Sequence, residues 1–186
     1  MSWWRRSLIS KELAAQLHER RPGAGDVLAV GHGGRVRVLA TEECLVLLRE
    51  DAPAGEGPTA SENAEARDDS WEFIGWHTIS RGGWKAERSE LRWTFVDMSE
   101  ARVQLDDPGR VPEVFRDRVN SSVVVEKVSE APGGGHVVVA GRRQLGPHAS
   151  PGVVWQVTTM GKARLSDPAT AQLATAEARA LQQDFE

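Results

Sequence analysis

The chain has 186 residues and a mass of 20.4 kDa, and its 27 acidic and 23 basic residues give a formal net charge of -4. This length allows one domain, or one domain with a substantial extension. Hydrophobic residues make up 40% of the chain and charged residues 27%, which is ordinary globular usage and excludes wholesale disorder. The mildly acidic balance argues against a general nucleic-acid-binding surface, because such a surface needs clustered lysine and arginine.

The first residues and the cysteine content restrict the setting of the protein. Residues 1–10 contain no apolar stretch of the length that a secretory signal needs. No run of about 18 apolar residues that could span a membrane occurs anywhere in the chain. Cys44 is the single cysteine, so an internal disulfide or a CxxC metal site is excluded. We therefore expect a cytoplasmic protein.

The first predicted element is a short helix over residues 10–20, because Ile9, Leu13 and Leu17 recur at a spacing of four residues. Three predicted strands follow, and valine alternates with arginine in the second, as in a half-buried strand. These strands cover residues 26–31, 35–41 and 44–49.

Residues 50–70 differ in character from the rest of the chain. They contain no large apolar side chain and are rich in Gly, Pro, Ala and Ser, so they bury too little surface to offset the entropy of ordering. We expect a mobile loop here. It carries seven acidic residues against one arginine, so the remainder of the chain has a formal charge of +2. An anionic ligand is therefore not excluded by the overall charge.

Four more strands and a helix are predicted after this loop. Gly82 and Gly83 are expected to open a hairpin within the strand series, which covers residues 71–79, 84–87, 91–97 and 101–105. The helix covers residues 111–120, because Pro112 suits a first turn and four apolar residues recur at helical spacing, namely Val111, Val114, Phe115 and Val119.

The last part of the chain predicts a three-stranded sheet and a C-terminal helix. The strands cover residues 122–128, 136–142 and 152–160. The helix begins with Ser166 or Asp167 as its N-cap and Pro168 at its first position. Its apolar stripe consists of Ala174, Ala178, Leu181 and Phe185. The fold class is thus α+β.

Seven short strands followed by one amphipathic helix is the element order of a pleckstrin-homology-like (PH-like) barrel. Segments such as IGWHTI at 74–79 and PEVFRDRV at 112–119 also resemble bacterial PH-like domains in an uncharacterised actinobacterial protein family. This resemblance implies an antiparallel seven-stranded barrel with its open end plugged by the helix. The expected organisation is a leading helix in residues 1–25, the barrel in 26–120 and a sheet-plus-helix extension in 121–186.

Catalytic motifs are absent from the sequence. No dinucleotide fingerprint, P-loop or nucleophile elbow occurs, and the five histidines lack the spacing of metal ligands. Cys44 opens an apolar strand, which predicts a buried and unreactive thiol. We predict no catalytic residue, no metal and no cofactor, although a hydrolase of unknown type stays open as a minor alternative.

The candidate ligand site is the first predicted hairpin, with His32, Arg35 and Arg37. In lipid-binding PH domains this hairpin holds phosphorylated headgroups, and guanidinium groups pair bidentately with phosphate. A solvated outer strand face explains the same two arginines.

A second candidate is an interaction segment at the start of the chain, formed by Trp3, Trp4, Arg5 and Arg6. Tryptophan favours membrane interfaces and arginine favours anionic lipid. The helix that follows suits packing on the domain at least as well, so peripheral membrane contact and docking both stay open.

The tryptophans at 71, 76, 84 and 93 could line a ligand site, but large aromatic residues normally fill cores, and we expect core packing. The element order of residues 111–186 matches a double-stranded-RNA-binding domain, yet its last helix lacks a basic start. We therefore predict a non-enzymatic binding or scaffold module that contacts a protein partner and no nucleic acid. The alternatives are a binder of anionic lipid or a small anion through Arg35 and Arg37, and a homodimer in which exposed strand edges are covered.

Overall fold

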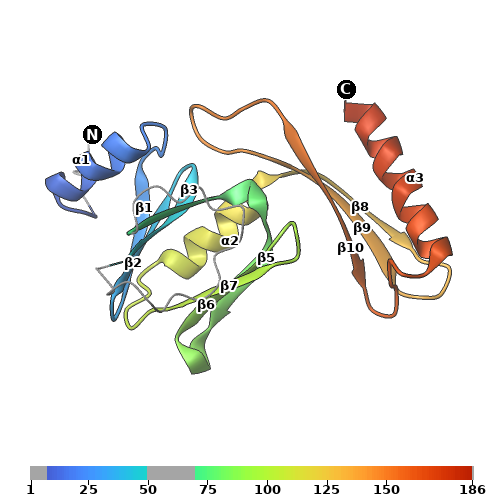
Figure 1. Ribbon diagram of the computed structural model, residues 1–186, viewed down its shortest axis with the longest axis horizontal. Helices are drawn as coiled ribbons and strands as arrows, with labels where there is room; N and C mark the ends of the chain where they lie inside the picture. Colours follow the sequence, from blue (N-terminus) through green and yellow to red (C-terminus); the bar gives the residue numbers. More distant parts are fainter. Residues whose placement is uncertain (1–7, 50–69, 186) are drawn as a thin grey trace, which may run out of the picture.

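The computed structural model describes residues 8–49 and 70–185, which form an α+β structure with three α-helices and three antiparallel sheets (Figure 1). The predicted acidic loop lies outside the described residues except for Ser70. Sheet A has the order β1-β2-β3-β4, with bounds Val27–Gly33, Val36–Thr41, Cys44–Arg49 and Trp71–Gly75. Sheet B has the order β5-β6-β7, with bounds Ile79–Lys85, Glu90–Phe95 and Glu100–Gln104.

Sheet C has the order β10-β9-β8, and its strands are β8 (Val123–Glu130), β9 (His136–Arg143) and β10 (Val153–Met160). The three helices are α1 (Lys11–Arg20), α2 (Val111–Ser122) and α3 (Pro168–Phe185). Two short 3-10 turns, η1 (Trp76–Thr78) and η2 (Ala86–Arg88), connect strands. Within the described ranges, no helix is long and apolar enough to cross a membrane.

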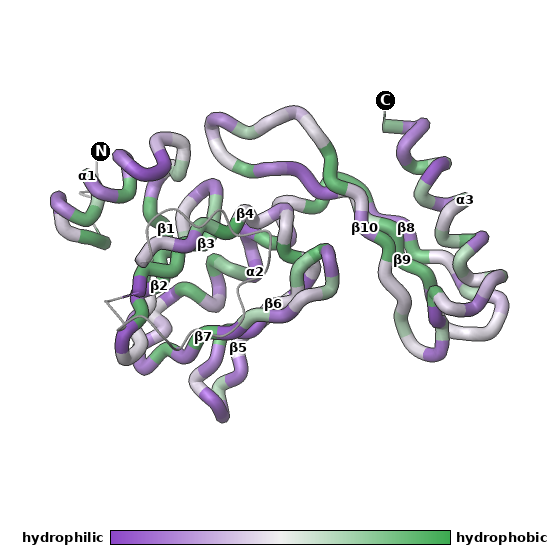
Figure 2. Tube along the Cα trace, in the orientation of Figure 1, coloured by the Kyte–Doolittle hydropathy of each residue, from purple (hydrophilic) through white to green (hydrophobic). Residues whose placement is uncertain are grey.

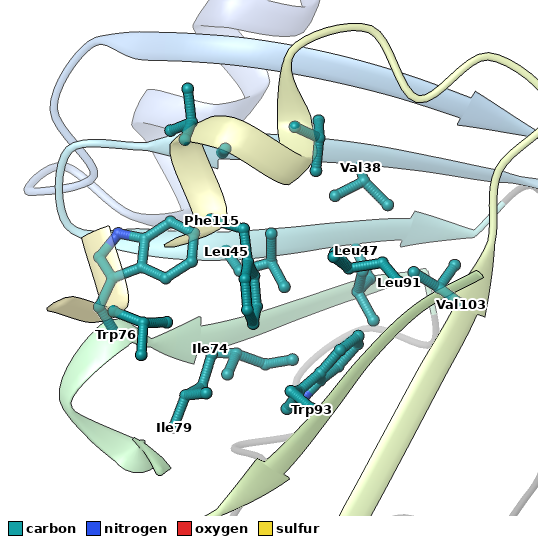
Figure 3. Packing of buried hydrophobic residues seen from close by; sticks show 14 of the residues in the cluster. Val38, Leu45, Leu47, Ile74, Trp76, Ile79, Leu91, Trp93, Val103 and Phe115 are labelled. Atoms are coloured by element: carbon teal, nitrogen blue, oxygen red, sulfur yellow. The ribbon is translucent and has the colours of Figure 1, made fainter. Parts of the chain in front are cut away.

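The main core lies where α2 is held between sheet A and sheet B (Figure 1). Phe115 of α2 is fully buried, with its ring centroid 5.9 Å from that of Trp76 and 6.3 Å from that of Trp93 (Figure 3). Such tilted and edge-on contacts suit the quadrupoles of aromatic rings. The predicted core role is therefore confirmed for Trp76 and Trp93, and Trp84 packs half-buried against the same cluster.

A second apolar cluster covers the outer face of sheet A. Leu13 and Leu17 of α1 pack there with Leu39, Val46 and Trp71. The helix starts at the N-cap Ser10, whose Oγ accepts a hydrogen bond from the backbone N–H of Leu13. The predicted packing of this helix on the domain is confirmed, and Trp71 belongs to this second cluster rather than to the main core.

A closed barrel is not confirmed. Seven strands and the helix occur in the predicted order, but sheets A and B remain separate sheets. In the described part of the chain, His32 and Asp107 form an isolated antiparallel bridge between β1 and the segment after β7. Their two backbone hydrogen bonds measure 2.7 and 2.9 Å. The two sheets therefore approach at this corner without a continuous ladder.

The predicted hairpin of residues 84–87 and 91–97 is present, since Trp84 pairs with Leu91, but its first strand begins before Gly82 and Gly83 rather than after them. Both lie inside β5, paired with Trp93 and Arg92 of β6, and the turn is formed by η2. A Cβ atom on Gly82 would lie 2.6 Å from the carbonyl oxygen of Arg92 and 2.8 Å from the Phe115 ring. Gly82 thus permits close packing rather than a turn. The predicted strand 71–79 is likewise divided by η1 into β4 and the start of β5.

In sheet C one face is covered by α3, and the sheet and its helix project away from the rest of the molecule (Figure 1). The helix packs Ala174 against Val137 and Val139 of β9, within the hydrophobic stretch that Figure 2 shows along this sheet. The predicted N-cap Asp167 accepts hydrogen bonds from the backbone N–H and the hydroxyl of Thr170. The predicted stripe on α3 is confirmed as its packing face.

Sheet C is joined to the first region by polar contacts. The buried guanidinium of Arg142 in β9 donates hydrogen bonds to the Val119 carbonyl, the Ser122 hydroxyl and the Ser80 carbonyl. A cation at this position also complements the negative end of the α2 dipole. The Gln156 amide donates to Ser80 Oγ at 2.6 Å. Leu145, which follows β9, is also buried in the main core, so directional hydrogen bonds and an apolar contact together hold sheet C against the first region.

Candidate functional site

Four arginines from different segments surround a hollow of about 780 Å³ on sheets A and B. They are Arg35 at the β1–β2 turn, Arg49 at the end of β3, Arg88 in η2 and Arg102 in β7. We call this feature the basic hollow. The rest of its lining is Gly34, Val36, Glu90, Val103 and Gln104.

The four guanidinium groups differ in their partners. Arg49 pairs with Glu72 at 3.2 Å, and Arg102 lies 3.8 Å from the buried carboxylate of Glu90. Arg35 and Arg88 are exposed and form no ion pair with any residue of 8–49 or 70–185. The described lining of the basic hollow therefore has an excess of positive charge, with Glu90 as its single acidic residue.

The backbone around Gly33 brings the β1–β2 turn against the end of β7. A Cβ atom on Gly33 would lie 2.1 Å from the Gln104 carbonyl oxygen, so only glycine fits here without movement of the chain. The Gly34 N–H donates to the Asp106 carboxylate at 2.9 Å. Together with the His32–Asp107 bridge, these contacts place Arg35 on the same hollow as Arg102.

The structure separates the three residues of the predicted ligand site. Arg35 lines the basic hollow, whereas His32 and Arg37 do not. Those two are direct neighbours on adjacent strands, because His32 pairs with Arg37 in the β1–β2 ladder. The predicted interaction residues Trp3, Trp4, Arg5 and Arg6 lie outside the described residues.

Sequence reasoning missed Arg49, Arg88 and Arg102, which complete the basic hollow. Each is one exposed arginine in a strand or a short turn, and no local pattern marks it. The signal that could have found them is the register of the sheets, because strand ends and turns at one end of a sheet pair lie close together in space. The predicted turn between residues 87 and 91 contains Arg88, but the position of this residue beside Arg35 depends on how sheet B packs against sheet A.

A buried polar cluster surrounds Glu43, which lies in the turn between β2 and β3. Its carboxylate is 4% exposed and accepts hydrogen bonds from Arg21 at 3.3 Å and from the Gln144 amide at 2.7 Å. Burial lowers the pKa of His77, and the nearby Arg21 cation adds to this shift. The contact with Gln144 ties the β9–β10 connection to sheet A, so this cluster is a structural junction.

Cys44 lies beside this junction and is fully buried. Burial raises the pKa of its thiol to about 11, although a hydrogen bond with Thr41 opposes part of the shift. The thiolate, which is the nucleophilic form, is therefore scarce at neutral pH. In the described part of the chain, no group of three His, Cys, Asp or Glu side chains could hold a metal ion.

A second hollow of about 770 Å³ lies between α1 and β1, with apolar lining from Leu17, Val27 and Leu28. Its two arginines are both engaged, since Arg21 pairs with Glu43 and Arg110 pairs with Glu113 at 3.3 Å. Arginines without an ion-pair partner are thus a property of the basic hollow and not of this one.

Comparison of the chain with models of known protein families, with curated proteins and with solved structures finds no match.

Proposed function

We propose that the chain is a non-enzymatic binding module that holds an anionic, phosphate-bearing group in the basic hollow. The observation that carries this proposal is the convergence of four arginines, two of which have no ion-pair partner among the described residues. Guanidinium groups present planar pairs of donors that match phosphate oxygens, and they stay charged at every physiological pH.

The PH-like arrangement proposed for residues 26–120 is consistent with this function. Four strands, then three strands, then a helix follow one another along the chain, and the helix lies between the two sheets. The basic hollow includes the turn between the first two strands, where the resemblance places a ligand site. The proposed similarity is one of element order, and the sheets of this chain do not close.

The chemistry of the lining favours binding over catalysis. Serine, threonine, cysteine and histidine are absent from the described residues that line the hollow, so this lining offers no nucleophile. Glu90 is the one candidate for a general base, and it lies against Arg102. A group bound here would be held by charge-assisted hydrogen bonds and released unchanged.

The experiment is a calorimetric titration of the full chain with pyrophosphate. We expect wild-type protein to bind and the variant Arg35→Ala/Arg88→Ala to bind at least about tenfold more weakly, because a hydrogen bond to a charged group contributes roughly 1.5–3 kcal/mol. The matched control is Arg116→Ala/Arg143→Ala, which removes two exposed arginines that do not line the hollow. This control should leave the affinity unchanged.

Two results would overturn the proposal: no binding of pyrophosphate by the wild type, or equal weakening in both double variants. Vesicles with and without anionic lipid distinguish the source of the phosphate group. Recruitment to anionic vesicles that the Arg35→Ala/Arg88→Ala variant loses would indicate a lipid headgroup, and binding of free pyrophosphate alone would indicate a soluble ligand.

Contact with a protein partner is the second candidate function. The observation in its favour is the exposure of apolar side chains on the face of sheet C that α3 leaves uncovered, including Val128 and Met160, which are 53% and 57% exposed. In a pull-down, the variant Val128→Lys/Met160→Lys should lose a stoichiometric partner that the wild type retains. Retention of the same partner by both forms would exclude this face as the binding surface.

A further inference from the structure

Sheet C has two edge strands, β8 and β10. An edge strand presents unpaired N–H and C=O groups and can pair with another strand. Natural proteins protect such edges with charged side chains, bulges, proline or a covering segment. The two edges of sheet C differ sharply in this protection.

The β8 edge is protected in two ways. Its pairing with β9 has an irregularity between Val123 and Val125, which distorts the edge. Its sequence also carries charges at Glu126, Lys127 and Glu130. A strand added to β8 would therefore meet a distorted ladder and would have to accommodate these charges.

The β10 edge has none of these devices. Its eight residues, VVWQVTTM, include neither a charged side chain nor a proline. They pair with β9 without interruption, from Val153 opposite Arg143 to Met160 opposite His136. Within the described residues, no backbone group of β10 forms a hydrogen bond to a segment other than β9. The outer side of β10 is a straight, uncharged edge.

The edge of β1 provides an instructive contrast, since this strand is also uncharged apart from His32. Its edge is closed by its own chain. His32 bridges to Asp107, and Gly109 approaches so closely that a Cβ atom there would lie 2.5 Å from the Val30 carbonyl oxygen. No such segment of residues 8–49 or 70–185 is bonded to the outer side of β10.

We propose that β10 pairs in antiparallel orientation with β10 of a second copy of this chain, forming one six-stranded sheet across a two-fold axis. A symmetric antiparallel pair brings each residue near its own copy or near a residue of the same strand, so a charged residue close to the two-fold axis would be repelled by its own copy. The uncharged β10 meets this requirement and β8 does not.

Phe185 provides a second observation at the same seam. Its ring packs edge-on against Trp155 of β10 at a centroid distance of 6.0 Å, yet the residue remains 47% exposed. In the proposed pair, both copies of α3 lie on the same face of the continuous sheet. The two Trp155–Phe185 pairs would flank the seam and lose exposed apolar area. This interface is separate from the basic hollow and goes beyond the proposed ligand binding.

The test is analytical ultracentrifugation of the full chain, with two variants that are matched in position. Thr158 of β10 and Val128 of β8 both pair with Val138 of β9, so they occupy the same row on opposite edges. We expect wild-type protein to dimerise, Thr158→Lys to raise the dimer dissociation constant at least about tenfold, and Val128→Lys to leave it unchanged. Circular dichroism checks that each variant is folded.

A wild type that stays monomeric at about 100 μM would overturn the proposal. If Thr158→Lys and Val128→Lys weaken the dimer equally, the proposal is wrong and the contact runs through the face of sheet C that α3 leaves uncovered. A dimer that Thr158→Lys does not weaken would also overturn the proposal. If Thr158→Lys fails to fold, hydrogen exchange of the wild type decides. Amides of β10 should become more protected than those of β8 as the concentration rises, and equal protection would contradict the pairing.

Discussion

The region that contains sheets A and B and the region that contains sheet C cover their sheets differently. The central strands of sheet A are buried on both faces, by α2 on the inner side and by α1 on the outer side. Sheet C is covered by α3 on one face. On its other face, the end that lies far from the first region is uncovered, and Val128 and Met160 are exposed there.

This difference indicates a division of roles. The first region has a core of large residues, including Trp76, Trp93 and Phe115, and burial of such residues is the main stabilising contribution in a folded domain. The core of the second region consists of smaller side chains, such as Val137, Val139 and Ala174. We expect stability to reside in the first region and the capacity for association in the second.

The largest expected effect is that of Phe115→Ala in the first region. Removing this fully buried ring should lower the free energy of unfolding by about 3–5 kcal/mol, because a cavity remains between the sheets. Leu181→Ala, in the half-buried face of α3, should cost about 1–2 kcal/mol. Urea denaturation measures both values. Equal costs would contradict the proposed division of stability.

An intermediate effect is expected at the joint between the two regions. Arg142→Ala removes the guanidinium donor of the Ser80 carbonyl and one of the two donors of the Val119 carbonyl, which keeps its bond from the Ser122 hydroxyl, and it should cost roughly 2–3 kcal/mol. Arg143→Ala, at the exposed neighbouring position, should change stability by less than about 0.5 kcal/mol. In hydrogen exchange, Arg142→Ala should loosen sheet C more than sheet A. A uniform loss of protection would show that the two regions unfold as one unit.

The smallest expected effect is a loss of α3 stability at acidic pH. Hydrogen bonds from Thr170 lower the pKa of Asp167, and Lys127 and Ser129 lower the pKa of Glu177. Carboxylates with lowered pKa values stabilise the fold above their ordinary pKa, near 4, and this contribution disappears as the pH falls through the lowered values. The helical circular dichroism signal of wild-type protein should therefore decrease at acidic pH.

The variant Asp167→Asn/Glu177→Gln tests this assignment. It should have a weaker helical signal already at neutral pH and a smaller change on acidification. Asp184→Asn, at an exposed position of the same helix, is the control and should behave as wild type. An identical acid profile for the double variant and the wild type would contradict the role of these two carboxylates.

Local sequence signals predict most of the fold. Apolar spacing indicates all three helices, and Asp167 serves as an N-cap as expected, whereas the N-cap role of Ser10 was not predicted. Glycine is ambiguous, because the same residue permits a turn or a close approach. Gly82 faces Phe115, which is distant in the sequence, so its role inside β5 could not be read locally.

Of the four arginines that line the basic hollow, only Arg35 could be predicted from the sequence. Arg35 lies in a hairpin that the sequence marks clearly, and it does line the basic hollow. The positions of Arg88 and Arg102 beside Arg35 depend on how the β5–β6 turn and β7 of sheet B pack against sheet A. This packing is tertiary and leaves no local pattern in the sequence. The polar joint at Arg142 could not be predicted either, because the sequence does not distinguish a buried arginine from an exposed one.

The tight contact between Gly33 and Gln104 has a consequence for the strength of binding. It anchors the tip of the β1–β2 hairpin to the neighbouring sheet before any ligand arrives. The backbone that carries Arg35 is thus preorganised, and ligand binding is not weakened by the entropy of ordering a flexible loop. What remains to be immobilised on binding is a set of arginine side chains, each extending from a backbone that is already in place.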